Sequence, residues 1–350
     1  MSVVTALDAL IVRLEYREPV RVGQDRPMAR DALIVRMADE DGRIGLGEAT
    51  DLPHPDAVAT AMSWAVGRSP VDLHASGGPW ALGLLPQRFC GALESAIADL
   101  AARQVGEPVA RLLAGTDARV DVRVNALLEV MGPGDAAAAT ARDLIADGFD
   151  TLKVKLDGGV NGGPQAWWRD ALVVIRDAVG VGTALRLDLN GMLTPDAAAE
   201  WLPTLVDLGL EYVEQPIAPS HGPDALAALR DTGVPLAADE SVTDLGAALD
   251  LLEAGCDALV IKPGRVGGPL RAHAIVEAAA EAGVPVTIST LHETGVGLAA
   301  ALHVAAAVPG DRAHGLATGR LLANDPVEGF PGVDRGRLAV RGPGLGVTLA

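Results

Sequence analysis

Two lysines lie two positions apart inside an otherwise apolar run, TLKVKL, at residues 151–156. In a β-strand, residues i and i+2 point to the same face, so Lys153 and Lys155 are expected side by side. Two ammonium groups this close are costly unless an anion faces them or one of them gives up its proton. The pair therefore indicates either a charged edge strand or part of an active site.

Three acidic residues end three successive β-rich runs, and another lysine ends the run after them: Asp188 in LRLDLN, Glu214 in YVEQP, Asp239 in LAADES and Lys262 in LVIKPG. A single acid in such a place is usually a helix cap or a solvated loop residue. Here the acids recur after 26 residues (188 to 214) and 25 residues (214 to 239). Adjacent strands lie about 4.8 Å apart, so the three carboxylates should converge and need a cation between them. Oxygen-only ligands favour Mg²⁺ over zinc, with Mn²⁺ as the alternative.

This constellation predicts abstraction of a proton from the carbon next to a carboxylate. Lys155 is the candidate base, because Lys153 and the metal both disfavour its protonated form. Lys262, roughly opposite, is a second acid or base, or a cation that stabilises the intermediate. The carbon acid is very weak, so the metal is needed to stabilise the enediolate that forms.

Three polar residues directly follow the predicted metal ligands. Asn190 lies two residues beyond Asp188, and Glu240 and Ser241 follow Asp239. In these positions their side chains could orient the metal-binding carboxylates by hydrogen bonds. Capping of the next helix is the alternative for Asn190 and Ser241.

The elements that must position these residues are parallel strands that alternate with helices. From about residue 120, alanine-rich helical stretches alternate with short β-rich runs. The β-rich runs lie at 121–129, 150–155, 184–189, 211–214, 234–238, 257–262 and 284–290. The pattern predicts an α/β fold of βα units. With an eighth strand near 311–317, it favours a closed (β/α)7-8 barrel of the TIM type, whose chemistry lies at the carboxyl ends of the strands. The first strand is followed by no glycine-rich dinucleotide fingerprint, which disfavours an open Rossmann sheet.

The rest of the chain is expected to cover the mouth of this barrel. Residues 1–118 predict an α+β capping domain, with strands before residue 50 and a lead-in helix at 91–113. The barrel is expected at 119–320, and the irregular segment 321–350 is expected to pack on the capping domain.

Composition and charge restrict the class of protein. The 350 residues include 46 acidic and 28 basic side chains, a net charge of −18 that disfavours binding to nucleic acid. Cys90 and Cys256 are far apart and do not predict a disulfide framework, so a cytoplasmic location is expected. The start lacks the pattern of a signal peptide, and the apolar run 296–309 is too short to span a bilayer. The alanine-rich helices leave a homo-oligomer open.

The motif formed by Lys153-Val-Lys155, the three acids and Lys262 resembles the muconate-lactonizing enzyme subgroup of the enolase superfamily. The resemblance covers nearly the whole chain, including IGLGEA (44–49) at the end of the capping sheet. It implies a Mg²⁺ enzyme acting on a small-molecule carboxylate. The subgroup includes o-succinylbenzoate synthases, dipeptide epimerases, muconate cycloisomerases and N-succinylamino acid racemases.

One stretch discriminates among these reactions. Dipeptide epimerases carry Asp-x-Asp after the eighth strand, and the matching HGLATGRLL has Leu316 and Thr318 in those places, which argues against an α-amino substrate. Together with ISTLHETGVGLAAAL (288–302), it resembles o-succinylbenzoate synthases, which dehydrate a cyclohexadiene carboxylate on the way to menaquinone. Racemisation or epimerisation by two opposed lysines and muconate-type cycloisomerisation stay as alternatives. A non-catalytic binding module is disfavoured because every lysine and ligand of the motif is present.

The resemblance also suggests which residues meet the substrate. Loops near 20–27 and 50–55 are expected to close over the barrel mouth, where Arg21 and Arg26 would meet a second carboxylate or remain solvated loop residues. The substrate-binding set is completed by Ser289, Leu316 and Thr318. Arg265 and the glycine-rich insert 158–163 depart from the pattern in the region that shapes substrate choice.

Overall fold

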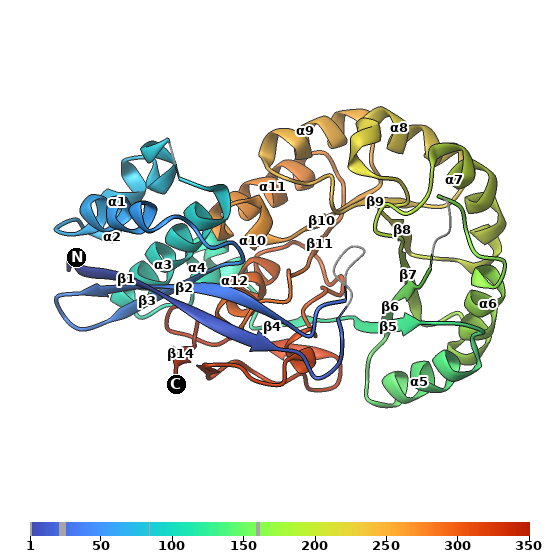
Figure 1. The fold of residues 1–350 in the computed structure, drawn as a ribbon, viewed down its shortest axis with the longest axis horizontal. Helices are drawn as coiled ribbons and strands as arrows, with labels where there is room; N and C mark the ends of the chain where they lie inside the picture. The colour runs from blue at the N-terminus through green and yellow to red at the C-terminus, as the bar shows by residue number, and fades with distance from the viewer. Residues whose placement is uncertain (1, 21–25, 84, 159–161) are drawn as a thin grey trace.

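A three-stranded antiparallel sheet opens the chain (Figure 1), whose computed structural model describes residues 2–20, 26–83, 85–158 and 162–350. Its order is β1-β2-β3, with strands at Val4–Glu15, Ala29–Asp39 and Ile44–Ala49. The last two strands are joined by a turn at Asp39–Gly42. Gly42 adopts a φ of 79°, and its N–H donates to the carbonyl of Asp39.

Helices α1 (Pro55–Ala65), α2 (Pro70–Ala75) and α3 (Gln87–Val105) cover one face of this sheet. Helix α4 (Val109–Ala114) follows and packs beside α3, and 3₁₀ turns lie at η1 (Gly78–Leu82) and η2 (Gly115–Asp117). Helix α3 lies directly on β3. A Cβ atom at Gly47 would lie only 1.8 Å from the carbonyl oxygen of Ala92, so the sheet and the helix can approach this closely only because glycine stands there.

The lead-in helix differs slightly from the prediction for 91–113. Helix α3 begins at Gln87, four residues earlier, and ends where Gly106 takes a left-handed φ of 76°. Pro108 then precedes α4, so the predicted helix is divided in two at Gly106 and Pro108.

Seven parallel strands form the predicted barrel sheet in the order β11-β10-β9-β8-β7-β6-β5, with bounds Ala126–Val130 (β5), Thr151–Leu156 (β6), Ala184–Asp188 (β7), Tyr212–Glu214 (β8), Leu236–Ala238 (β9), Ala258–Ile261 (β10) and Val286–Ile288 (β11). The eighth position is filled by isolated bridges rather than by a full strand. His314 pairs with Val124 and Gly315 pairs with Ser289, both in parallel, which links the two edges of the sheet.

The first predicted strand, 121–129, is divided in two. Only β5 belongs to the barrel, whereas β4 (Asp121–Arg123) pairs in antiparallel fashion with β13 (Arg337–Ala339) near the C-terminus. The sequence pattern could not reveal this, because the partner strand lies more than 200 residues further along the chain.

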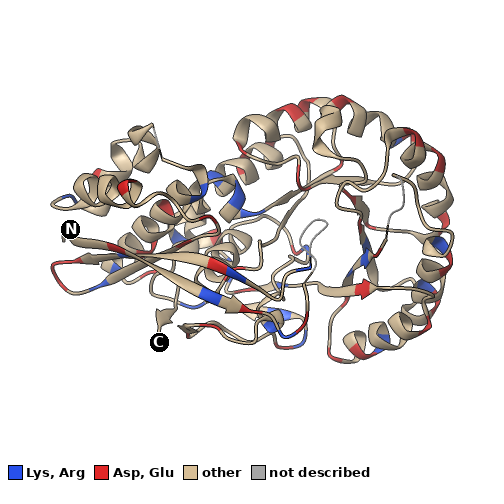
Figure 2. Ribbon diagram, in the orientation of Figure 1, with Lys and Arg blue, Asp and Glu red and all other residues tan. Residues whose placement is uncertain are grey.

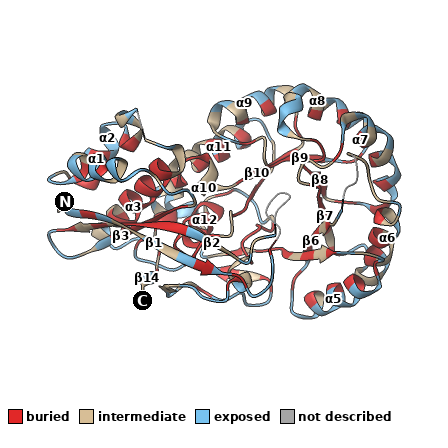
Figure 3. Cartoon of the chain, viewed as in Figure 1, coloured by how far each residue is buried: buried red, intermediate tan, exposed pale blue. Residues whose placement is uncertain are grey.

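Helices surround the barrel, with bounds Asp135–Ala146 (α5), Trp168–Val179 (α6), Pro195–Trp201 (α7), Gly222–Ala228 (α8), Leu245–Ala254 (α9), Pro263–Val266 (α10), Pro269–Glu281 (α11) and Gly295–Ala306 (α12). Short 3₁₀ turns lie at η3 (Leu202–Leu208), η4 (Pro219–His221), η5 (Leu229–Thr232) and η6 (Gly319–Leu321). Figure 3 shows the barrel strands buried and the outer faces of these helices exposed. The main hydrophobic core lies between the strands and the helices.

Two buried carboxylates connect the first sheet and its helices to the barrel. Glu48 on β3 accepts hydrogen bonds from the backbone N–H groups of Thr294 (3.0 Å) and Gly297 (3.1 Å), which begin α12, and pairs with Arg30 at 2.9 Å. Glu94 on α3 likewise accepts from the N–H of Leu270 at 2.9 Å, at the start of α11. Each carboxylate thus occupies the positive end of a barrel helix.

The C-terminal segment, with short strands β12 (Val327–Glu328) and β14 (Thr348–Leu349), contacts the first sheet and its helices. Leu345 and Val347 pack in one buried cluster with Ile34 and Leu46. The N–H of Leu345 donates to the buried Asp99 carboxylate of α3 at 2.7 Å. These contacts agree with a tail that covers the capping region, while the domain boundaries at 118 and 320 stay a prediction.

The surface is acidic, as the net charge of −18 requires. Figure 2 shows acidic residues spread along the helices around the barrel. In the described part of the chain, every helix is too short or too polar to cross a membrane.

Candidate active site

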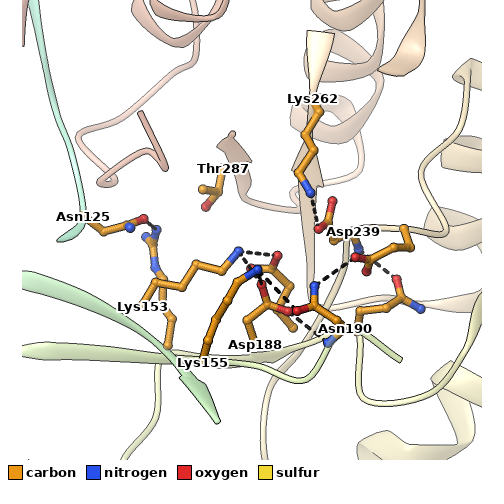
Figure 4. Close-up of polar contacts among 12 residues, drawn as sticks. Asn125, Lys153, Lys155, Asp188, Asn190, Asp239, Lys262 and Thr287 are labelled. Atoms are coloured by element: carbon orange, nitrogen blue, oxygen red, sulfur yellow. Dashed lines mark hydrogen bonds and ion pairs between the residues drawn. The ribbon is translucent and has the colours of Figure 1, made fainter. Parts of the chain in front are cut away.

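The ends of β6, β7 and β8 bring the predicted residues together (Figure 4). The sheet register places Lys155 beside Asp188 and Asp188 beside Glu214. Lys153 lies two residues before Lys155 and points into the same space. The alternation of strand side chains thus directs both lysines and both acids into the barrel mouth.

Asp188, Glu214 and Asp239 offer carboxylate oxygens that lie within 4.8 Å of one another. All three side chains are buried. The second oxygen of Glu214, Oε2, has no hydrogen-bond partner among the described residues. Three converging carboxylates, one of them with a free buried oxygen, are a donor set that fits a hard divalent cation.

Lysines neutralise these carboxylates. Lys153 Nζ lies 2.6 Å from Glu214 Oε1 and 2.8 Å from Asp188 Oδ2, and Lys155 Nζ lies 3.2 Å from the same Asp188 oxygen. From the opposite side (Figure 4), Lys262 Nζ lies 2.5 Å from Asp239 Oδ2. The contacts of both lysines to Asp188 Oδ2 are ion pairs.

The charges shift one another strongly. Burial, followed by the charge of Asp188, raises the pKa of Glu214 to about 8. Burial alone would lower the pKa of Lys153, but the facing carboxylates of Asp188 and Glu214 hold that pKa well above its usual value. Burial would likewise raise the pKa of Asp239, but Lys262 and Arg265 hold it below its ordinary value. The cluster therefore concentrates negative charge that a cation would stabilise.

The chain shares its sequence family with enzymes. A family model described as "Enolase C-terminal domain-like" matches residues 136–350. The chain belongs to this family. It is therefore an enzyme of the enolase superfamily with a TIM-type barrel.

Characterised relatives of this enolase-superfamily chain perform different reactions. An o-succinylbenzoate synthase from Thermobifida fusca is 39% identical over 210 residues, which are 59% of this chain and 62% of that protein. An N-succinylamino acid racemase from Thermus thermophilus is 29% identical over 85% of this chain and 74% of its own length. A dipeptide epimerase from Methylococcus capsulatus, complexed with Mg and the dipeptide L-Arg-D-Lys, has a TM-score of 0.87 and 28% identity over 99% of this chain and all of its own.

Of the three predicted neighbours of the carboxylates, Asn190 contacts Asp188, and Glu240 and Ser241 directly follow Asp239. Asn190 donates its backbone N–H to Asp188 (3.0 Å) and its amide to Glu240 (3.0 Å), and it accepts from Lys155 Nζ at 3.3 Å. The helices that follow are capped by Thr194 and Asp244 instead, so the helix-capping alternative for Asn190 and Ser241 does not hold.

Gln215 belongs to this network, although the sequence analysis did not single it out. Its Oε1 accepts from the N–H groups of Asp239 (3.0 Å) and Ser241 (3.1 Å), and its Nε2 donates to Ser241 Oγ at 2.9 Å. It thereby ties the end of β8 to the end of β9. Its position directly after Glu214 in YVEQP was the one sign in the sequence that Gln215 lies near the site. The sequence does not indicate that its amide contacts the residues that follow β9.

Arg265 lies against Asp239, one of the three converging carboxylates. Its guanidinium donates to Asp239 Oδ1 at 2.8 Å and to the Asp239 carbonyl at 2.7 Å. The middle of the glycine-rich insert 158–163 lies outside the described residues.

The cavity at the mouth includes part of the predicted substrate-binding set. Its lining comprises Asn125, Leu127, Lys153, Lys155, Lys262, Ser289, Thr290, His292, Gly315, Ala317 and Thr318. Ser289 and Thr318 are therefore at the cavity. Leu316 is not: it is buried in the core outside the strands, because alternation along 315–317 turns its side chain away.

Arg26 lies at the rim, where it pairs with Asp157 at 3.1 Å and Glu129 at 3.5 Å. These acids follow β6 and lie on β5, so the arginine does reach the barrel mouth from the first domain. Its guanidinium is therefore already paired with two carboxylates of the protein itself. Arg21 lies outside the described residues.

Proposed function

We propose that the protein is a Mg²⁺-dependent carbon-oxygen lyase that forms o-succinylbenzoate by syn-dehydration of its cyclohexadiene carboxylate precursor. The observation that supports this most directly is the opposition of Lys155 and Lys262 across Asp188, Glu214 and Asp239. The three acids would hold the metal, which would supply positive charge to the substrate carboxylate during proton abstraction.

The residues of the chain would carry the remaining steps. Lys155 Nζ would take the α-proton from the substrate carbon, and the electrons of that C–H bond would move into the substrate carboxylate. Lys262, as an ammonium group, would stabilise the resulting anion from the other face. When the C–O bond breaks, Lys155 would return its proton to the departing hydroxide, so water leaves and Lys155 is again the free base.

The lining of the cavity supports an acidic substrate without a free amino group. Among the described residues that line it, none carries a carboxylate, and the charged members are Lys153, Lys155 and Lys262. An ammonium group in this cavity would find no carboxylate among these lining residues, whereas a second carboxylate or a carbonyl oxygen would find hydroxyl and ammonium donors. This favours o-succinylbenzoate formation over dipeptide epimerisation and agrees with Leu316 and Thr318 in place of two acids.

Racemisation of N-acylamino acids is the second candidate. A lysine faces an acid on each side of the site, with Lys155 near Asp188 and Lys262 near Asp239. Removal of a proton by one lysine and return by the other would invert the carbon. An N-acyl group also avoids the ammonium that the cavity disfavours. We propose muconate-type cycloisomerisation only after these two.

The deciding experiment follows the absorbance of the cyclohexadiene precursor in the presence of protein and Mg²⁺. A kcat/KM of about 10⁴ M⁻¹s⁻¹ or more is expected for a native substrate. Slower or absent turnover, combined with rapid exchange of the α-proton of N-succinylamino acids in deuterated water, would select the racemase instead. Mn²⁺ is expected to substitute for Mg²⁺. With the lyase reaction, we place the protein on the cytoplasmic route to menaquinone.

A further inference from the structure

His292 is a polar side chain of the cavity that the proposed chemistry does not use. It lies on loop 289–294, which follows β11, and it lines the same cavity as Lys155 and Lys262. Part of the residue is exposed to the cavity, but its Nδ1 atom is covered and has no hydrogen-bond partner in the described chain. Neither ring nitrogen has a hydrogen-bond partner among the described residues, so the imidazole can bind a ligand in this cavity without giving up a contact of its own.

The backbone of His292 is strained in a way that marks functional positions. Its φ is 61°, in the left-handed region that non-glycine residues seldom adopt. Among the described residues, the others of this kind are Asn190, Gln215 and Arg335. Asn190 and Gln215 also follow barrel strands at the mouth. Strain of this kind persists where the surroundings hold it, and it concentrates at active sites.

Two residues of the N-terminal region hold His292 in place, Arg30 on β2 and Tyr16 directly after β1. Arg30 Nε donates to its carbonyl oxygen at 3.2 Å, and Arg30 is itself fixed by the buried Glu48. The Tyr16 ring meets the imidazole edge-on, with 6.3 Å between the centroids. The imidazole is therefore positioned by its backbone and by its ring, while its Nδ1 remains unpaired among the described residues.

The charge state of His292 is set by its neighbours. Burial, and then the charges of Lys155 and Lys262, lower the pKa of the imidazole to about 3. At neutral pH the ring therefore carries one N–H donor and one acceptor. The charged groups that line this cavity are lysines, so the group that fits beside the ring is an oxygen acceptor.

We propose that His292 is a substrate-contacting residue that donates its N–H to an oxygen of the non-reacting acyl chain, such as the carbonyl or carboxylate of a succinyl group. This inference rests on the proposed function, because it assumes that the reacting carboxylate lies at the three acids. It assigns recognition of the distal group to the loop after β11, in addition to the capping loops.

The test compares His292→Leu with His292→Asn. Asparagine tolerates a left-handed backbone and keeps an N–H donor on the side chain, whereas leucine removes the donor. The probes are o-succinylbenzoate, which carries the acyl chain, and benzoate, which lacks it. Each is titrated by calorimetry into protein with Mg²⁺, and the melting temperature of each variant is recorded.

Loss of one hydrogen bond corresponds to roughly 2- to 13-fold in affinity. His292→Leu should weaken o-succinylbenzoate by about tenfold and leave benzoate unchanged, whereas His292→Asn should stay within about threefold for both. With the cyclohexadiene precursor, KM should rise in His292→Leu while kcat changes little. Unchanged affinity for o-succinylbenzoate in His292→Leu, equal weakening of both probes, or a fall in kcat alone would overturn the assignment.

The proposed function can fail without deciding this question. If the wild type does not turn over the precursor, the same variants are titrated with N-succinylphenylalanine and with 3-phenylpropionate, and the same selective loss is expected. If the wild type binds none of the four probes, the assignment is overturned. If His292→Leu does not fold, His292→Gly removes the imidazole and also relieves the backbone strain.

Discussion

Replacement of Glu48 by glutamine should destabilise the protein, although Glu48 is not one of the three acids of the candidate metal site, Asp188, Glu214 and Asp239. The side chain is fully buried, pairs with Arg30, and accepts from Thr294 N, Thr294 Oγ1 and Gly297 N. Glutamine keeps the shape but removes the negative charge and one of the two acceptor oxygens. A buried donor of Arg30 or of the α12 terminus then loses its partner.

The expected magnitude follows from these contacts. Removal of one partner from a buried ion pair costs about 3 to 5 kcal/mol, and the retained amide oxygen places Glu48→Gln near about 3 kcal/mol. The entropy of unfolding is about 2.1 cal/mol/K per residue, so the whole chain has about 0.7 kcal/mol/K. The melting temperature should therefore fall by about 4 °C.

The assay is thermal and urea unfolding of Glu48→Gln beside a matched exposed control, Glu40→Gln. Glu40 accepts a single 3.3 Å hydrogen bond at the surface, so its variant should stay within about 0.5 kcal/mol of the wild type. A melting temperature for Glu48→Gln within about 1 °C of the wild type would refute the reasoning, since the carboxylate would then not connect β3 to α12.

Three further outcomes are expected. Lys155→Ala should lose about 10²- to 10⁴-fold in kcat, measured on the precursor, and near-full turnover would place the base elsewhere. Asp239→Asn should abolish Mg²⁺ binding by calorimetry together with activity, and retained binding would exclude Asp239 as a ligand. Burial raises the pKa of Glu94 from 4.5 to about 7, so the folded state holds a proton that the unfolded state releases, and stability falls as pH rises from about 4.5 to 7. The unfolding free energy of the wild type should decrease between pH 5 and pH 8, and in Glu94→Gln this decrease should be smaller by about 2 to 3 kcal/mol. If the variant shows the same pH dependence as the wild type, Glu94 is not its cause.

The convergence of the three acids could be predicted because it depends on two regularities, the alternation of strand side chains and the regular spacing of βα units. Successive strands of the sequence are adjacent in this parallel sheet. The acids at their ends, Asp188, Glu214 and Asp239, therefore lie next to one another. Their roles as ligands, and those of the lysines, stay predictions.

The contacts that could not be predicted lack this regularity. Gln215 ties two strand ends through an amide whose direction depends on a left-handed backbone, with a φ of 41°. Leu316 was expected at the substrate because the motif places it after the eighth strand, but that strand is reduced to isolated bridges and its alternation decides which side chains face the cavity. The pairing of β4 with β13 joins segments that no local pattern relates.

The pairing of β4 with β13 and the burial of Leu345 beside Ile34 also affect how the chain folds. The first sheet completes its buried cluster only with residues near position 345, and the barrel strands form between these two partners in the sequence. Contacts of such long sequence separation require a large loop to close before they contribute, which slows folding. During synthesis, the N-terminal sheet would therefore wait with apolar surface uncovered until the last segment arrives, and this interval is when the chain is most exposed to aggregation.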